Sequence, residues 1–117
     1  MWIRMASVFM LLAVGFGAFG AHAMRGKISD YSLDVYKTAV LYQFIHALGL
    51  FVIAWLSSIS QDPKINIAGF LMMAGIVLFS GSLYVLSISG LKWLGVLTPL
   101  GGLCFLAAWG CLFFVRA

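Results

Sequence analysis

Few side chains in this sequence could bind a metal or exchange a proton near neutral pH. His22 and His46 are its two histidines, and Cys104 and Cys111 its two cysteines. Zinc ligands must converge at about 2.0–2.3 Å, but Cys111 is expected at the opposite end of the molecule from the histidines. Counted inward from the nearest charged residue, His22 and His46 differ by six positions. An offset of about 9 Å disfavours a haem held by both, so we predict no metal and no cofactor.

The same inventory disfavours catalysis and ion-coupled transport. Nucleophilic hydrolysis needs a base that a further group, often a carboxylate, orients. The long apolar segments contain no Asp, Glu, Lys or Arg, and a proton- or sodium-coupled carrier generally needs one inside the membrane. An enzyme is therefore the least expected class.

The charged residues divide the chain into four long apolar segments. Hydrophobic residues make up 64% and charged residues 9%, whereas soluble domains carry roughly 25% charge. The uncharged gaps hold 20, 24, 27 and 23 residues, and a membrane-spanning helix needs about 20. The sequence predicts an all-α integral membrane protein, a single four-helix transmembrane bundle over residues 1–117, with helices near 3–23, 31–58, 66–89 and 93–115. The second helix is longer than the membrane core, so its N-terminal part should lie at the interface.

Polar side chains from all four helices gather in one half of the membrane. We call side B the surface that holds the connector 25–37 and the turn 90–92, and side A the surface with both termini. At about 1.5 Å per residue from the nearest side-B charge, the candidate site residues share the side-B half. They are His22, Tyr42, His46, Ser80, Tyr84, Ser87 and Thr98. Either they hydrogen-bond across helices and hold the bundle together, or they line a small polar pocket that binds or conducts a small neutral solute or lipid.

Small residues at helical spacing predict close helix packing. Ala13, Gly17 and Ala21 repeat at steps of four, which lets a neighbouring backbone approach. The third helix carries small or polar residues on two faces, so we expect it at the centre of the bundle. Proline removes a backbone hydrogen bond, so a kink is expected at Thr98-Pro99. The other residues predicted to pack are Gly75, Gly81, Pro99, Gly101 and Gly102.

The first apolar segment has some features of a secretory leader. Arg4 precedes it, and Ala21-His22-Ala23 has the form of a cleavage site. Its apolar core is longer than the roughly 7–15 residues of a leader, and its glycines are typical of packed membrane helices. We expect a retained first helix.

Four motifs occur in order along the chain. They are Gly17-Ala-Phe-Gly-Ala-His-Ala23, Thr38-Ala-Val-Leu-Tyr-Gln-Phe-Ile-His-Ala47, Phe79-Ser-Gly-Ser-Leu-Tyr84 and Thr98-Pro-Leu-Gly-Gly102. Over essentially its whole length the sequence resembles domain-of-unknown-function family 423, small bacterial inner-membrane proteins with a eukaryotic relative called transmembrane protein 256. The resemblance implies a four-helix, multi-pass inner-membrane protein. It implies no activity and no catalytic residue, because none is established for the family.

The distribution of charge predicts the membrane orientation and the kind of partner. The net charge of +4 comes from basic residues scattered at helix ends, a pattern of membrane orientation rather than of nucleic-acid binding. Side B carries four basic residues and side A three, which favours a cytoplasmic side B and termini on the periplasmic side. The expected partners are the lipid bilayer and either a second copy or a larger membrane complex. The function that fits best is a non-catalytic scaffold, accessory or assembly factor, with the polar pocket as the alternative.

Overall fold

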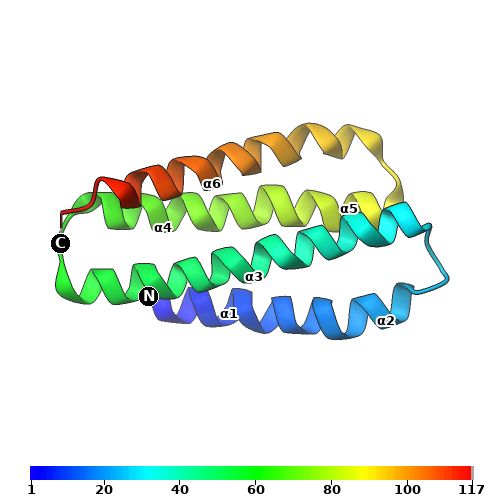
Figure 1. Ribbon diagram of the computed structural model, residues 1–117, viewed down its shortest axis with the longest axis horizontal. Coiled ribbons are helices and arrows are strands. Elements are labelled where there is room, and N and C mark those ends of the chain that lie inside the picture. The colour runs from blue at the N-terminus through cyan, green and yellow to red at the C-terminus, as the bar shows by residue number, and fades with distance from the viewer. Residues whose placement is uncertain (117) are drawn as a thin grey trace.

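The chain forms four helical rods, each long and apolar enough to cross a membrane (Figure 1). The structure is a computed structural model that describes residues 1–116, except for the side chain of Ala21. The rods cover Trp2–Met24, Asp30–Ile59, Pro63–Ser89 and Lys92–Phe113. The described residues form no β-strand, and the predicted all-α, four-helix membrane architecture is confirmed.

Three of the rods contain a turn of different helix geometry. In the first, a π-helical turn over Phe16–Gly20 joins α1 (Trp2–Gly15) to α2 (Ala21–Met24). The second rod is α3 alone (Asp30–Ile59). In the third, a π-helical turn over Ile76–Ser80 joins α4 (Pro63–Gly75) to α5 (Gly81–Ser89). The fourth begins with a 3-10 turn, Lys92–Val96, and continues as α6 (Leu97–Phe113).

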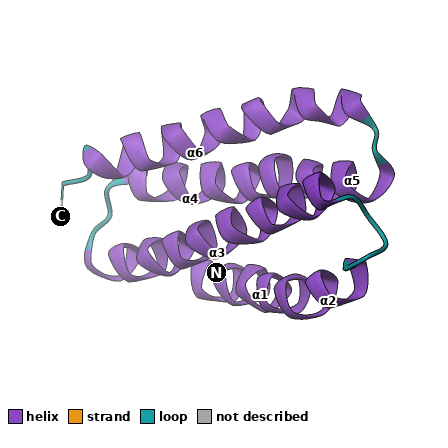
Figure 2. Cartoon of the chain, turned by 45° about the vertical axis from the view of Figure 1, so that its right-hand side comes forward, coloured by secondary structure: helices purple, strands orange, loops and turns teal. Residues whose placement is uncertain are grey.

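The second and third rods form the centre of the bundle. α1 and α6 lie at opposite edges in both views (Figure 1, Figure 2). Of the most apolar stretch of each rod, 39% is buried in both central rods, against 11% in the first and 17% in the fourth. The third helix therefore shares the central position with α3. Both chain ends lie at the same end of the bundle (Figure 1), which is side A.

Capping residues explain where the central helices begin. The Ser29 hydroxyl accepts a hydrogen bond from the backbone N–H of Ser32 at 3.1 Å and caps α3. Asp62 caps α4 in the same way, and Pro63 occupies the first turn, where no N–H is needed. This cap starts α4 at Pro63, three residues before the position expected from the hydrophobic pattern.

Asp62 also holds the C-terminal tail against the turn between α3 and α4. Its carboxylate accepts from the backbone N–H of Arg116 and from that of Lys64, each at 3.0 Å. The Ser60 hydroxyl donates to the Arg116 carbonyl at 3.1 Å. The backbone N–H groups of Arg116 and Lys64 hold the pKa of the Asp62 carboxyl below its ordinary value, which favours the charged carboxylate in these hydrogen bonds.

The tightly packed apolar core lies toward side A. Its members come mostly from the side-A half of each rod: Trp2, Ala6, Leu50, Ile53, Ile65, Ala68, Met72, Ile76, Phe105 and Ala108. At this end the Trp2 indole donates to the Asn66 side-chain oxygen at 2.9 Å and joins α1 to α4. The side-B half must therefore be held together by other contacts.

Glycines permit the closest helix contacts. A Cβ atom at Gly101 would stand 2.3 Å from the backbone nitrogen of Phe79, and one at Gly75 would stand 2.4 Å from the Phe105 ring. Gly17 is less crowded, with Val40 at 3.2 Å from such an atom, and Ala13 is fully buried. The side chain of Ala21, the third member of the predicted seam, lies outside the described residues.

Two predicted packing glycines have more room than expected. A Cβ at Gly81 would meet no atom within 4 Å, and one at Gly102 would lie 3.9 Å from the Phe79 ring. Gly81 directly follows the π-helical turn, whose extra residue changes the face that the next residues present. The expectation of close packing at Gly81 is thus corrected.

The start of the fourth rod reflects Pro99. The 3-10 turn ends at Val96, and Pro99 lies in the first turn of α6. Pro99 has no N–H to offer a preceding carbonyl, and the tighter turn before it accommodates this loss. The fourth rod thus changes from 3-10 to α-helical geometry before the proline, and the kink expected at Thr98-Pro99 stays a prediction.

A pair of glycine substitutions measures the helix contacts. Gly101→Ala places a methyl group against the Phe79 backbone, so we expect the free energy of unfolding to fall by about 1–3 kcal/mol. Gly81→Ala meets open space and should leave it unchanged or slightly raised. Thermal unfolding in mild detergent compares the two variants. Equal losses for both would show that α6 does not approach Phe79 this closely.

Candidate functional site

A buried glutamine joins three helices in the side-B half of the bundle. The Gln43 side chain, on α3, is 2% exposed. Its amide nitrogen donates to the Phe9 carbonyl of α1 at 2.9 Å, and its amide oxygen accepts from the Tyr84 hydroxyl of α5 at 2.6 Å. Both ends of the amide are therefore paired, as a polar group in a membrane requires.

Two further hydrogen bonds reach the π-helical turns. The Tyr36 hydroxyl donates to the Phe16 carbonyl at 2.5 Å, and the Ser80 hydroxyl donates to the Ala39 carbonyl at 2.8 Å. The rings of Tyr36 and Phe16 both pack against the Tyr84 ring, with centroids 5.2 and 4.9 Å away. Each π-helical turn thus contributes one partner to a hydrogen bond with α3. We call the side chains of Tyr36, Gln43, Ser80 and Tyr84 the three-helix network.

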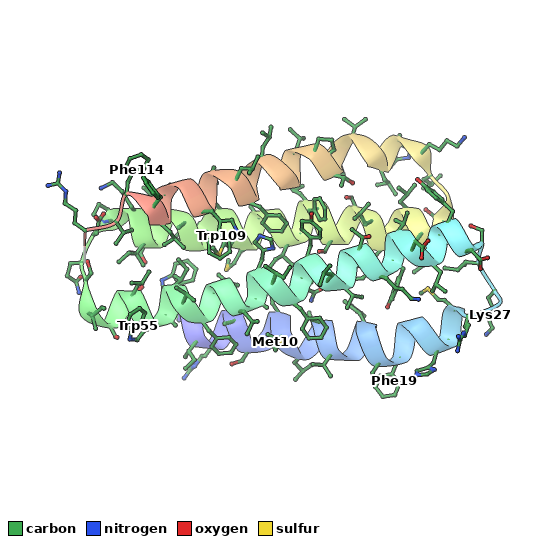
Figure 3. The ribbon with its side chains drawn as sticks, in the orientation of Figure 1. Met10, Phe19, Lys27, Trp55, Trp109 and Phe114 are labelled. Atoms are coloured by element: carbon green, nitrogen blue, oxygen red, sulfur yellow. The ribbon has the colours of Figure 1, made fainter. Side chains whose placement is uncertain are left out.

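His46 links α3 to α6 on the other side of the bundle. Its Nε2 accepts from the Trp109 indole N–H at 3.1 Å, so the ring proton resides on Nδ1, which donates to the Tyr42 carbonyl at 2.7 Å. The imidazole stacks on Phe105 with ring centroids 3.5 Å apart. Figure 3 shows Trp109 on the side of α6 that faces the rest of the bundle. Both nitrogens of His46 are used in holding two helices together.

The remaining candidates have three different surroundings. The Thr98 hydroxyl lies 2.7 Å from that of Ser82 and joins α6 to α5. The Ser87 hydroxyl donates to the Tyr84 carbonyl of its own helix at 2.8 Å. His22 is exposed at the side-B surface, in a hollow of about 370 Å³ that Arg25 and Lys37 also line. The seven candidates therefore do not converge on one cavity.

Tyr42 and His46 line a groove of about 700 Å³ between α3 and α6. Its other lining residues are Ile45, Phe79, Pro99, Gly102, Leu103, Phe105, Leu106 and Trp109. The groove is mainly apolar, with aromatic rings along its length. It differs in character from the small polar pocket that the sequence analysis considered.

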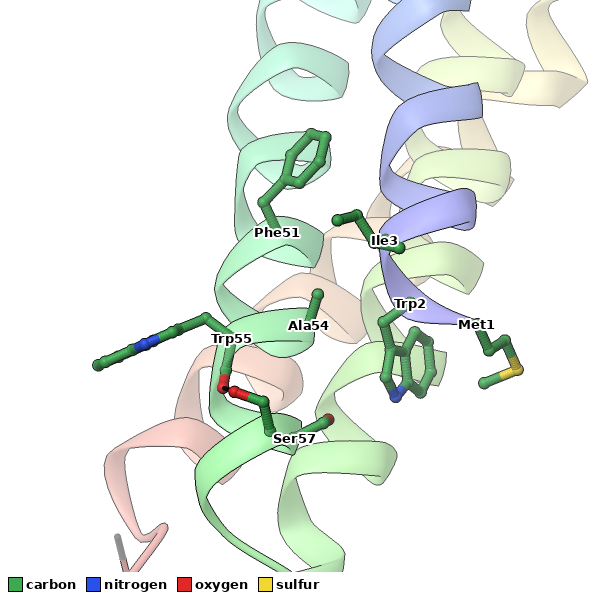
Figure 4. Close-up of a pocket in the computed structure, with 8 residues that line it drawn as sticks. Met1, Trp2, Ile3, Phe51, Ala54, Trp55 and Ser57 are labelled. Carbon is green, nitrogen blue, oxygen red and sulfur yellow. Dashed lines mark hydrogen bonds between the residues drawn. The ribbon is translucent and has the colours of Figure 1, made fainter.

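A second hollow of about 480 Å³ lies at side A, between the start of α1 and the end of α3 (Figure 4). Trp2, Trp55 and Ser57 are among its lining residues. Within the described part of the chain the buried Ser57 hydroxyl has no hydrogen-bond partner. No candidate site residue from the sequence analysis lies in this hollow.

Gln43, Tyr36 and Ser82 were not among the predicted site residues. A signal for Gln43 was present, since it is the one side-chain amide between Lys37 and Ser58. The buried face of α3 runs through Tyr36, Ala39, Gln43, His46, Leu50 and Ile53, at alternating steps of three and four. Thr38 and Tyr42, which lie off this face, are exposed.

Among residues 1–116, no three His, Cys, Asp or Glu side chains come close enough to hold a metal ion. Cys104 and Cys111 are free and partly buried. Of the buried polar side chains, Gln43, His46, Ser80 and Ser82 each hydrogen-bond to another helix.

Comparison with known proteins gives consistent matches along the chain. A family model described as "Protein of unknown function (DUF423)" matches residues 16–102. UPF0382 membrane protein YwdK of Bacillus subtilis is 52% identical over 109 residues, covering 92% of this chain and 89% of that protein. A UPF0382 membrane protein of Staphylococcus haemolyticus is 43% identical, covering 93% and 88%, and one of Staphylococcus aureus is 44% identical with the same coverage. No solved structure matches.

The three-helix network can be tested by a double-mutant cycle on Gln43 and Tyr84. Tyr84→Phe removes one hydrogen bond and should lower the free energy of unfolding by roughly 0.6–1.7 kcal/mol. Gln43→Leu removes two hydrogen bonds and should cost more. In the double variant the two losses should overlap, because one bond is shared. Tyr31→Phe, at an exposed residue, is the control, and strictly additive losses would contradict the shared bond.

Proposed function

This chain belongs to the DUF423 family, and we propose that it works as a non-catalytic scaffold, accessory or assembly factor in the bacterial inner membrane. It is an integral membrane protein, and its family has no known function. The observation that carries the proposal is the use of its buried polar side chains. Gln43 bonds α1 and α5, His46 bonds α6, and Ser80 bonds α3. Polar side chains whose hydrogen bonds go to neighbouring helices stabilise the arrangement of those helices.

The outer helices supply the surface for association. Only 11% of the apolar stretch of the first rod and 17% of that of the fourth are buried. Gly15 on α1 and Gly110 on α6 have no neighbouring atom within 4 Å of a Cβ position. Small residues let another membrane helix approach closely. We therefore propose that α1 and α6 contact a second copy of this chain or another membrane protein.

Site-specific cross-linking in native membranes tests this association. A photo-cross-linking amino acid replaces Leu11 or Leu106, each 71% exposed and four residues before an open glycine. Both positions should give a discrete protein adduct. Leu48, 56% exposed on α3 with Val52 four residues later, is the matched control and should give lipid adducts. If neither Leu11 nor Leu106 yields a protein adduct, the scaffold role loses its support.

We also propose that side B faces the cytoplasm and that both termini face the opposite compartment. Short loops on the cytoplasmic side carry the excess of Lys and Arg. Side B holds four such residues and side A three: Arg25, Lys27, Lys37 and Lys92 against Arg4, Lys64 and Arg116.

Two C-terminal fusions measure this orientation. Alkaline phosphatase, which is active only outside the cytoplasm, should be active when fused after residue 117. Green fluorescent protein exported by the general secretion route stays dark outside the cytoplasm, so its fusion should not fluoresce. A fluorescent fusion together with an inactive phosphatase would reverse the orientation.

A further inference from the structure

The groove between α3 and α6 has the length of one membrane leaflet. Along α6 it extends from Pro99 to Trp109, ten residues apart, which corresponds to about 15 Å of helix. The hydrocarbon core of a bilayer is about 30 Å thick. Phe79 and Phe105 are among its lining residues, and its volume is about 700 Å³. The length of this apolar groove is therefore about half the thickness of the hydrocarbon core.

Tyr42 supplies an unused hydrogen-bond donor at the side-B end of this groove. The Trp109 indole and both nitrogens of His46 bond one another or the backbone. The Tyr42 hydroxyl, in contrast, makes no hydrogen bond to any residue in the range 1–116. Tyr42 lies five residues from Lys37, about 7–8 Å inside the side-B surface. Its side chain leans toward the start of α3, which is toward side B.

An unpaired hydroxyl inside the membrane is costly, because no water is available to bond it. The molecule that fills the groove should therefore have a hydrogen-bond acceptor near side B and an apolar chain along the rest of the groove. A diacyl phospholipid has this order of groups, with an ester carbonyl under the headgroup and a hydrocarbon chain beneath.

We propose that the α3–α6 groove binds one acyl chain of a phospholipid from the side-B leaflet, with the ester carbonyl of that chain accepting a hydrogen bond from Tyr42. The chain runs over Phe79 and Phe105 toward Trp109. The inference goes beyond the scaffold role and holds whichever compartment side B faces.

A matched pair of lipids isolates the hydrogen bond. Native mass spectrometry in mild detergent measures binding of dioleoyl phosphatidylglycerol and of its dialkyl ether analogue, which lacks the ester carbonyls. The protein should retain one ester lipid per chain and prefer it over the ether lipid by about fivefold or more, the effect of one hydrogen bond. Tyr42→Phe should abolish this preference. Tyr31→Phe, which alters an exposed tyrosine outside the groove, should keep it.

A second pair of variants tests the groove itself. Gly102 lines the groove, and a Cβ there would lie 3.9 Å from the Phe79 ring, so Gly102→Leu should fill the space without disturbing the fold. Gly110→Leu, on the same helix but outside the groove, is the control. Gly102→Leu should lose the tightly held lipid, whereas Gly110→Leu should retain it.

Three results would overturn the proposal. They are equal retention of ester and ether lipids by the unaltered protein, an ester preference that survives Tyr42→Phe, and a tightly held species whose mass is that of a prenylquinone. Leu11 lies on α1, outside the groove, so its cross-linking outcome is independent of these results, and the lipid site and the scaffold role can fail separately.

Discussion

The amide of Gln43 is the interaction on which the side-B half of the bundle depends. A membrane offers no water to a buried amide, so both of its ends must find partners within the protein. They find them on different helices, the Phe9 carbonyl on one side and the Tyr84 hydroxyl on the other. This requirement fixes the spacing of α1, α3 and α5 together. The side-A half needs no such constraint, because Leu50, Met72 and their neighbours form a packed apolar core there.

Much of the fold could be predicted because charge has a large and simple cost in lipid. The gaps between charged residues gave the number of membrane-spanning helices. The two π-helical turns could not be predicted in this way. They depend on partners from another helix, such as Tyr36 for the turn at Phe16, and no local pattern of residues specifies such a partner. The same long-range dependence explains why Gly81 turned out less crowded than Gly101.

For the candidate site residues, the depth in the membrane could be predicted, but the direction in which each side chain points could not. Depth follows from counting residues inward from a charge, and this count brought Tyr84, Ser80 and Thr98 into one half of the membrane. Direction around each helix axis depends on which neighbour the helix meets. Tyr84 therefore faces Phe16 and α3, Thr98 faces α5, and His22 remains at the surface. A common depth was thus a poor guide to a common cavity.

The π-helical turns have a consequence for how this sequence tolerates changes in length. A π-helical turn encloses one residue more than an α-helical turn. Deleting a residue from an ordinary helix rotates everything beyond it by about 100° and moves buried side chains to the outside. Deleting one residue within Ile76–Ser80 would instead relax that turn to α-helical geometry and leave both flanking segments in phase with their neighbours. The two turns are therefore the points at which these helices can shorten by one residue without exchanging their inner and outer faces.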